Sequence, residues 1–274
     1  MIIKADNIVF VYNKDEVNMA TVTIKNILTN YSKSGENGKA VILLHGWGQN
    51  IEMMKPIEDH LASNFQVYNI DLPGFGESAE PLESWSVYDY ADFLKQFINN
   101  FKLYNPILIA HSFGARLAII YAANNPVDKM IITGGAGILD ERGADYYFKV
   151  YSYKLIKRGL DLFHLNKYKA ALQKNAGSSD YQNTTGIMRE TLVKIVNEDL
   201  SKYLEDIKAE VLLVWGDKDE ATPLWMAKKM EASIPNVGLA IFEGDDHFAY
   251  YHQMPRFLRV IDIFLEKDRL ATNE

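Results

Sequence analysis

Three residues that could act together in nucleophilic catalysis each follow an apolar run of strand length. They are Ser112 in PILIAHSFGA, Asp219 in LLVWGDKDEATP and His247 in LAIFEGDDHF. A serine hydroxyl becomes a nucleophile when an imidazole accepts its proton, and a carboxylate orients that imidazole. Histidine suits the role because its ordinary pKa, near 6.5, lets it accept a proton and return it at neutral pH. The combination indicates nucleophilic catalysis by a serine.

The setting of Ser112 is that of a nucleophile presented on a tight turn. The apolar strand PILIA leads into it and the helical pattern FGARLAIIYAA leads out of it, with the small residues Ala110 and Gly114 two positions before and after. Small residues are needed there because strand and helix must approach each other closely. The alternative is a serine that caps the helix through a side-chain hydrogen bond.

The loop LLVWGDKDEATP offers two aspartates. Asp219 lies farther into the loop, four residues before Pro223, whereas Asp217 directly follows the strand and is typical of a turn or cap. We therefore favour Asp219 as the acid. Among the imidazoles, His247 follows the last strand and can reach the Ser112 turn. Four others have structural interpretations: His60 and His164 in helical patterns, His252 near the start of the last helix, and His111 packed beside the turn.

The elements that must position these residues alternate along the chain. Continuous apolar runs, typical of strands buried on both faces, lie at 40–46, 65–74, 106–112, 129–135, 210–217 and 238–244. Helical patterns lie at about 51–63, 86–101, 113–125, 223–233 and 255–267. Before them, NIVFVY and ATVTIKNIL predict two antiparallel strands, followed by a polar turn in SKSGENGK. The fold class is α/β, with a mostly parallel central sheet of about eight strands and helices on both faces.

Residues 138–206 break this alternation, because they contain several helical patterns and no good strand. We interpret them as a helical cap, or lid, inserted into a core formed by residues 1–137 and 207–274. Residues 141–174 carry eight basic and three acidic residues, with tyrosines and phenylalanines interleaved. This pattern is compatible with contact to a membrane surface. Apolar faces packed on the core, with lysines in water, explain it better.

Composition excludes several classes of protein. The chain of 274 residues has a formal net charge of −7 and no cysteine. The charge disfavours a nucleic-acid partner, and the lack of cysteine excludes disulfides, thiolate nucleophiles and cysteine-ligated zinc. No apolar stretch reaches 18 residues, and the N-terminus has no signal-peptide pattern. We expect a cytoplasmic protein without stable membrane insertion, and the sequence does not indicate its oligomeric state.

The segments LLHGWG, DLPGFGES, AHSFGA, GDKDEATP and GDDHF occur in this order. Together they resemble the α/β-hydrolase superfamily from about residue 40 to the C-terminus, apart from the lid, although Ala110 replaces the first glycine of the usual nucleophile turn. The resemblance implies Ser112 as nucleophile, Asp219 as acid and His247 as base. It also implies an oxyanion hole formed by the backbone N–H groups of Trp47 and Phe113, and neither metal nor organic cofactor.

Serine at position 112 excludes the chemistry of dehalogenases and epoxide hydrolases of similar fold, which carry aspartate there. The expected function is that of a serine hydrolase, a carboxylesterase that acts on a small or hydrophobic ester. An acyltransferase or perhydrolase and a carbon–carbon bond hydrolase remain open within the same fold. A non-catalytic ligand-binding protein is the alternative of another class.

The remaining polar residues near the strand ends have structural interpretations. We expect His45 and Gly46 to fix a loop, Asp71 to form a turn, and Lys218 and Thr222 to be solvated. Arg116, one helical turn after Ser112, could form either a structural ion pair or an anion-binding site. The sequence leaves both alternatives open.

Overall fold

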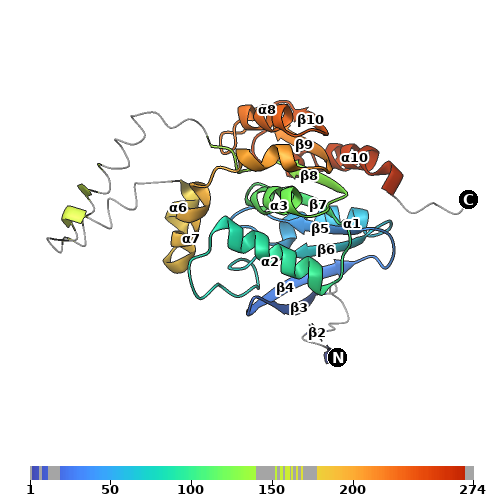
Figure 1. The fold of residues 1–274 in the computed structure, drawn as a ribbon, viewed down its shortest axis with the longest axis horizontal. Coiled ribbons are helices and arrows are strands. Elements are labelled where there is room, and N and C mark those ends of the chain that lie inside the picture. Colours follow the sequence, from blue (N-terminus) through green and yellow to red (C-terminus); the bar gives the residue numbers. More distant parts are fainter. Residues whose placement is uncertain are drawn as a thin grey trace, which may run out of the picture.

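A computed structural model describes residues 19–139 and 178–268, the backbone of residues 2–5 and 8–11, and scattered positions between 152 and 168. Within these residues the chain forms one sheet of ten strands with helices on both sides (Figure 1). The strand order is β1-β2-β3-β4-β6-β5-β7-β8-β9-β10. The α/β class and the mostly parallel central sheet predicted from the sequence are confirmed.

Six parallel strands form the centre of the sheet. They are β5 (Ala40–Leu44), β6 (Gln66–Ile70), β7 (Ile107–His111), β8 (Lys129–Thr133), β9 (Glu210–Gly216) and β10 (Val237–Phe242). Every residue of β7 and β8 is buried, which explains why their apolar runs are continuous. The strand order reverses at β5, which lies between β6 and β7. In such sheets, ligands bind beyond the carboxyl ends of the strands at this reversal.

The antiparallel edge of the sheet differs from the prediction. It consists of β1 (Ile2–Ala5), β2 (Ile8–Val11), β3 (Met19–Ile24) and β4 (Ile27–Ser34). The segment ATVTIKNIL is not one strand, because the chain turns at Lys25 and Asn26, which have φ values of 50° and 62°. Two consecutive residues at positive φ form the type of turn that matches the twist of a hairpin. The new strand, β4, extends into the segment that was predicted to be a polar turn.

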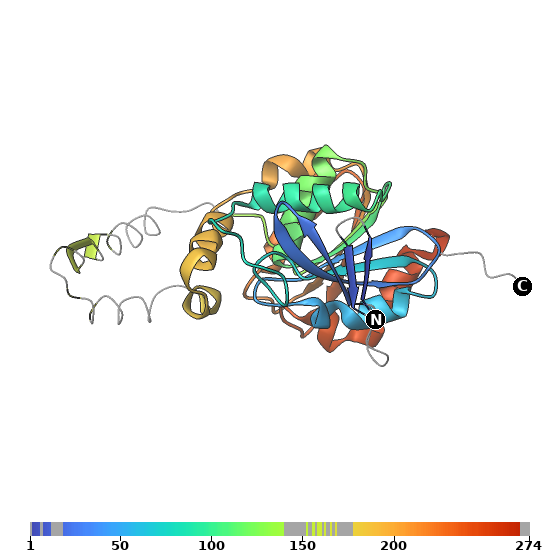
Figure 2. The same cartoon turned by 90° about the horizontal axis from the view of Figure 1, so that it is seen from below.

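Helices cover the two faces of the sheet as separate layers (Figure 2). One layer contains α2 (Val87–Asn100), α3 (Phe113–Asn124) and α8 (Leu224–Ser233). The other contains α1 (Ile51–Leu61), α9 (Ala249–His252) and α10 (Met254–Phe264), after which η2 (Glu266–Asp268) ends the described chain. Alternate side chains of β5 enter different cores: Ile42 and Leu44 pack toward α2 and α3, whereas Val41 and Leu43 pack toward α1 and α10. The sheet therefore separates two hydrophobic cores.

Residues 178–206, between β8 and β9, form α6 (Ser179–Asn183), α7 (Gly186–Val196) and η1 (Ser201–Asp206). The α6–α7 pair lies at one end of the core, shown in gold in Figure 1. It contacts the loops that follow β5 and β6: Trp47 Nε1 donates to Thr184 Oγ1 at 3.3 Å, and Met188 lies against Gly74. The cap over 138–206 remains a prediction, since most of 140–177, with its basic and aromatic positions, lies outside the described residues. Within the described part of the chain, no helix is both long and apolar enough to span a membrane.

Candidate active site

Ser112 connects β7 to α3 through a sharp turn. Its φ is 48° and its ψ is −108°, a backbone conformation that residues other than glycine rarely adopt. It holds the position directly before the first turn of α3, but its side chain makes no capping hydrogen bond. A helix-capping role is therefore excluded in this structure, and Ser112 instead lines a cavity.

The small residues on either side of Ser112 allow the close contact that the turn needs. A Cβ atom on Gly114 would lie 2.4 Å from the carbonyl oxygen of Leu44, far inside van der Waals distance. Ala110 is fully buried at the end of β7. Helix α3 can therefore begin directly against the end of β5 only because position 114 carries no side chain.

The backbone of Ser112 is held on both sides by hydrogen bonds. Its N–H donates to the carbonyl oxygen of Thr133 on β8 at 3.1 Å. Its own carbonyl oxygen accepts from the N–H groups of Ala115 at 3.1 Å and Ala136 at 3.0 Å. None of these contacts uses the hydroxyl, so the fold fixes the position of residue 112 independently of its side chain.

His247 and Asp219 are joined by a direct hydrogen bond. His247 Nδ1–H donates to Asp219 Oδ2 at 2.8 Å, and the other carboxylate oxygen accepts from the N–H groups of Ala221 at 2.9 Å and Thr222 at 2.8 Å. Burial favours a raised pKa for Asp219, but the hydrogen bonds with His247 and Thr222 outweigh it, so the pKa lies below its ordinary value. An ionised Asp219 keeps the proton of His247 on Nδ1 and leaves Nε2 as the basic nitrogen.

Of the two aspartates in this loop, Asp219 contacts His247 and Asp217 does not. Asp217 is exposed, and its Oδ1 accepts the N–H of Gly244 at 2.6 Å, which connects the loops after β9 and β10. Its neighbour Lys218 is exposed, as expected. Asp217 therefore fits a turn residue.

The expectation that Thr222 is solvated is wrong, because only 5% of this residue is exposed. Its hydroxyl lies 2.8 Å from Asp219 Oδ2, 3.0 Å from the Gly134 carbonyl oxygen and 3.2 Å from His247 Nδ1. The Asp219 carboxylate turns back to bind the backbone of residues 221 and 222, which draws the threonine inward. The Asp-x-x-Thr spacing, typical of such a turn, was the available signal.

Gly134 leaves room for the imidazole of His247. It has a φ of 51°, and a Cβ atom there would lie 3.0 Å from His247 Nδ1, closer than almost all Cβ contacts. In the sequence, Gly134 is simply the residue after an apolar run. In the structure, its missing side chain gives the imidazole of His247 its space.

A cavity of about 510 Å³ brings the predicted residues together, because Ser112, His247, Trp47 and Phe113 all line it. Among the described residues, no hydrogen bond connects the Ser112 hydroxyl to His247, and the backbone N–H groups of Trp47 and Phe113 are not hydrogen-bond donors. The N–H of Phe113 opens α3, where the helix dipole favours negative charge. Much of the remaining wall is apolar and consists of Ile138, Leu139, Leu192, Ile195, Val196 and Met226.

A second cavity of about 630 Å³ adjoins the first. Trp47, Gln49, Asp180 and Phe248 line both and therefore mark their boundary. The second cavity also has the carboxylate of Glu80 in its wall. Asp180, on α6, was not identified from the sequence, and burial raises its pKa.

His45 and Asp71 have the structural roles expected for them. His45 Nδ1–H donates to the Gly46 carbonyl oxygen at 2.7 Å, and its Nε2 accepts the N–H of Leu72 at 3.0 Å, which fixes the loop that carries Trp47. Asp71 accepts hydrogen bonds from the N–H of Ile51 at 2.8 Å and from Asn30 Nδ2 at 2.8 Å. It thereby anchors the start of α1.

His111 packs beside the turn, as predicted. Its Nδ1–H donates to the Thr133 carbonyl oxygen at 2.9 Å, and the centroid of its ring lies 4.8 Å from that of His247. Burial lowers the pKa of His111 to about 3, and burial also lowers that of His45 to about 4. Both imidazoles are therefore neutral in the folded protein near pH 7.

Two buried neutral histidines should make the protein less stable as the pH falls below about 6.5. In that range the unfolded chain binds a proton at each histidine and the folded chain does not, so the free energy of unfolding decreases by roughly 1 kcal/mol per pH unit and histidine. Urea unfolding between pH 7.5 and 5 will measure the slope. His111→Asn keeps a donor for the Thr133 carbonyl oxygen. In this variant the slope should be smaller by the contribution of one histidine, roughly 1 kcal/mol per pH unit. An unchanged slope would show that His111 is protonated in the folded state.

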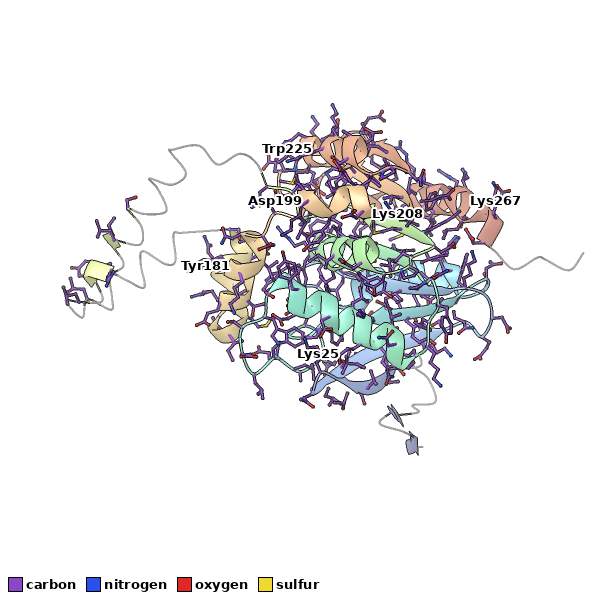
Figure 3. The ribbon with its side chains drawn as sticks, in the orientation of Figure 1. Lys25, Tyr181, Asp199, Lys208, Trp225 and Lys267 are labelled. Atoms are coloured by element: carbon purple, nitrogen blue, oxygen red, sulfur yellow. The ribbon has the colours of Figure 1, made fainter. Side chains whose placement is uncertain are left out.

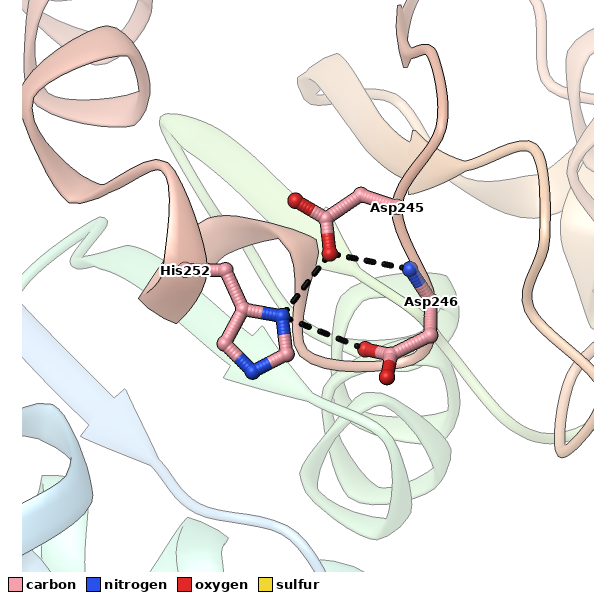
Figure 4. A group of neighbouring side chains, drawn as sticks. All are labelled: Asp245, Asp246 and His252. Atoms are coloured by element: carbon pink, nitrogen blue, oxygen red, sulfur yellow. Dashed lines mark hydrogen bonds and ion pairs between the residues drawn. The ribbon is translucent and has the colours of Figure 1, made fainter.

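A group of polar side chains supports the loop that carries His247. His252 Nδ1 lies 2.8 Å from Asp245 Oδ1 and 3.5 Å from Asp246 Oδ1 (Figure 4). Gln253 Nε2 donates to Asp245 Oδ2 at 2.9 Å. The hydrogen bond with Asp245 raises the pKa of His252. These contacts hold residues 245 and 246 against α9, directly before His247.

Comparison with known proteins agrees with this geometry. The model of the alpha/beta hydrolase fold family matches residues 39–252, which include every candidate catalytic residue and both oxyanion-hole candidates. The chain belongs to the α/β-hydrolase fold family. The superfamily resemblance found in the sequence is thus confirmed, and this α/β-hydrolase shares the family's architecture of a parallel sheet with helices on both faces.

Its relatives include enzymes with different substrates. The α/β-hydrolase is 28% identical to the AB hydrolase superfamily protein YisY of Bacillus subtilis over 83% of this chain and 92% of that protein. It is 26% identical to 2-hydroxy-6-oxononadienedioate/2-hydroxy-6-oxononatrienedioate hydrolase 2 of Pseudomonas putida, over 86% and 91% of the two chains. A solved esterase from Exiguobacterium antarcticum superposes with a TM-score of 0.70 at 21% identity, over 90% of this chain and 98% of the esterase.

Proposed function

We propose that this α/β-hydrolase is a serine hydrolase that cleaves carboxylic esters through an acyl-serine intermediate. The observation that carries the proposal is the placement of Ser112. It lies at a strained turn, free of a capping bond, in the wall of the cavity that His247 also lines, and Asp219 holds His247 at 2.8 Å. A serine kept in this conformation for purely structural reasons would be expected to use its hydroxyl.

In the proposed first step, Ser112 Oγ attacks the ester carbonyl carbon while His247 Nε2 accepts the hydroxyl proton. The carbonyl double bond opens and its electron pair moves to the oxygen. The backbone N–H groups of Trp47 and Phe113 supply two unused donors for this oxyanion. Each donor of this kind contributes about 3 to 4 kcal/mol of transition-state stabilisation.

The tetrahedral intermediate then collapses, and the bond to the leaving alkoxide breaks. His247 returns its proton to that oxygen, so an alcohol departs and the acyl group remains on Ser112. Water then attacks the carbonyl carbon of the acyl-serine, with His247 again as the base. The bond to Ser112 Oγ breaks, His247 returns its proton to that oxygen, and a carboxylic acid is released. Asp219, ionised because its pKa is lowered, stabilises the positive charge that His247 carries in each half.

The walls of the cavity support a substrate with a small or medium-sized apolar part. A volume of about 510 Å³ is in the lower half of the range for small-molecule sites. Ile138, Leu192 and Ile195, which belong to the proposed cap of residues 138–206, form part of this wall. The proposed substrate is a small molecule, and the proposed reaction uses neither a metal nor an organic cofactor.

A second candidate is hydrolysis of a carbon–carbon bond next to a ketone. The Pseudomonas putida relative, named as a hydrolase of 2-hydroxy-6-oxo dienedioates, is similar over 86% of this chain. The same serine, histidine and oxyanion donors could act on a ketone carbonyl. We favour esters, because an alkoxide leaves far more readily than a carbanion, so ester cleavage needs no further residue to stabilise the leaving group.

A fluorophosphonate probe tests the proposal. The probe should label the native protein at Ser112, which peptide mass spectrometry will locate, and should label neither Ser112→Ala nor the denatured protein. 4-Nitrophenyl esters from acetate to decanoate should be hydrolysed with an optimum at short or medium chain length. If the native protein is not labelled, a binding protein is the better conclusion. If a 2-hydroxy-6-oxo-dienoate is cleaved faster than every ester, the second candidate replaces the first.

A further inference from the structure

The cavity that contains Ser112 also contains a buried positive charge. Arg116 lies on α3 one helical turn after Ser112, so the two residues lie on the same side of the helix. Only 6% of Arg116 is exposed, and it lines the cavity with Ser112 and His247. Burial lowers the pKa of Arg116 to about 10, so the guanidinium is still charged at neutral pH.

This guanidinium has few partners for its charge. Within the described part of the chain it donates one hydrogen bond, from Nη1 to the backbone carbonyl oxygen of Glu198 at 2.9 Å, and forms no ion pair. A guanidinium has five N–H donors. A buried charge is costly unless an opposite charge or several acceptors compensate it.

The nearest carboxylates are engaged elsewhere. Asp199, which precedes η1 and is labelled in Figure 3, accepts hydrogen bonds from Ser201 Oγ at 2.8 Å and from the N–H of Leu139 at 3.3 Å. The Glu198 side chain accepts a hydrogen bond from Tyr88. Both carboxylates affect Arg116 only through longer-range attraction. The guanidinium donors that Glu198 does not use are therefore available to a ligand in the cavity.

Arg116 is also held in place before any ligand arrives. Its side-chain stem lies against Gly137, where a Cβ atom would be 3.7 Å from Arg116 Cγ, and Nη1 is fixed by Glu198. A side chain that is already ordered loses little entropy when it binds a ligand. Asp180, which supplies the carboxylate in the wall of the first cavity, lies at the boundary with the second cavity, whereas Arg116 lines only the first.

We propose that Arg116 binds a carboxylate carried by the substrate, so that this hydrolase prefers esters with an anionic group near the scissile bond. The guanidinium matches a carboxylate in charge and in planar geometry. This inference rests on the proposed function, since it names the class of ester that the Ser112 site accepts. Of the two roles that the sequence left open for Arg116, a structural ion pair or an anion-binding site, the inference selects the anion-binding site.

Paired substrates test the role of Arg116. A carboxylate in the acyl part is supplied by the 4-nitrophenyl monoester of adipic acid, with its terminal primary amide as the neutral match. A carboxylate in the leaving group is supplied by 4-acetoxybenzoate, with 4-acetoxybenzamide as its match. For at least one pair, Arg116→Gln should reduce the anionic-to-neutral ratio of kcat/KM by about 10- to 100-fold. Losing the hydrogen bond to the Glu198 carbonyl oxygen would affect both members of a pair, so any structural effect of that loss cancels in the ratio.

Two further variants sharpen the test. Arg116→Lys keeps the charge but not the planar pair of donors, so its ratio should lie between those of the wild type and Arg116→Gln. Asp180→Asn removes the cavity's own carboxylate and should raise the ratio. If Arg116→Gln leaves both ratios at the wild-type value, the guanidinium has only a structural role and the inference is wrong, while the ester hydrolase remains.

A binding measurement separates the two proposals. Isothermal titration calorimetry with adipate needs no turnover, and the affinity should fall by about 10-fold or more in Arg116→Gln. If no ester is hydrolysed but adipate binding depends on Arg116, the proposed reaction is wrong and the anion site stands. Equal affinity in the wild type and Arg116→Gln would overturn the anion site whatever the reaction.

Discussion

Replacing Ser112 by alanine should reduce kcat for 4-nitrophenyl esters by about 10⁴- to 10⁶-fold, because the reaction loses its nucleophile. The fold should be retained. The backbone of residue 112 is held by Thr133, Ala115 and Ala136, and the hydroxyl takes no part in these hydrogen bonds. Initial rates at saturating ester, together with circular dichroism and thermal unfolding, will test both statements.

The control for this prediction is Ser201→Ala. Ser201 lies at the start of η1, and its hydroxyl donates to Asp199 rather than facing the Ser112 cavity. This variant should keep wild-type kcat for neutral esters within a few-fold. If Ser112→Ala were to retain more than a few per cent of wild-type activity while folded, Ser112 would not be the nucleophile, and a general-base mechanism through His247 would be the better interpretation.

The second large effect should separate two aspartates of the same loop. Asp219→Asn should lower kcat by about 10³- to 10⁴-fold, because an amide at this position can no longer balance the charge of His247 or hold its Nδ1 proton. Asp217→Asn should change kcat by less than about twofold. Its carboxylate is exposed, and within the described part of the chain its hydrogen bond is to Gly244, in the loop that follows β10.

The two variants form a matched pair, since the substitution is the same and the positions are two residues apart. Steady-state kinetics on one ester, with unfolding curves for each protein, will show whether a loss is catalytic or structural. Losses of similar size in both variants would indicate damage to the loop. The reverse order, with Asp217→Asn the slower enzyme, would mean that the acid in solution is not the one that contacts His247 here.

Much of the fold could be predicted, because burial on both faces leaves an unambiguous pattern. Strands such as β7 and β8 are buried at every position and mostly apolar, and the turn at Ser112 stands between a strand and a helix with small flanking residues. Each of these features is local, so a short segment contains it. Asp219 could also be preferred to Asp217 as the acid, since the distance of each residue from the end of the strand is visible in the same short segment.

Other features depend on atoms far apart in the chain and left no such pattern. The hairpin at Lys25 and Asn26 contains neither glycine nor proline, and it follows from pairing with β2 and β6 as much as from local preference. Thr222 was placed in solvent because a threonine in a polar loop is usually exposed. Its burial depends on the direction of the Asp219 carboxylate and on Gly134, 88 residues earlier. Asp180 reaches the cavity only through the position of α6.

The backbone of Ser112 also has a consequence for the evolution of stability. A non-glycine residue held in a sparsely populated conformation costs about 1 to 3 kcal/mol, a considerable part of the 5 to 15 kcal/mol by which proteins of this kind are typically stable. Glycine would adopt a φ of 48° without this strain but would have no hydroxyl. Selection for stability and selection for turnover therefore oppose each other at this position. Replacing Ser112 by glycine should therefore remove activity and, at the same time, increase the free energy of unfolding.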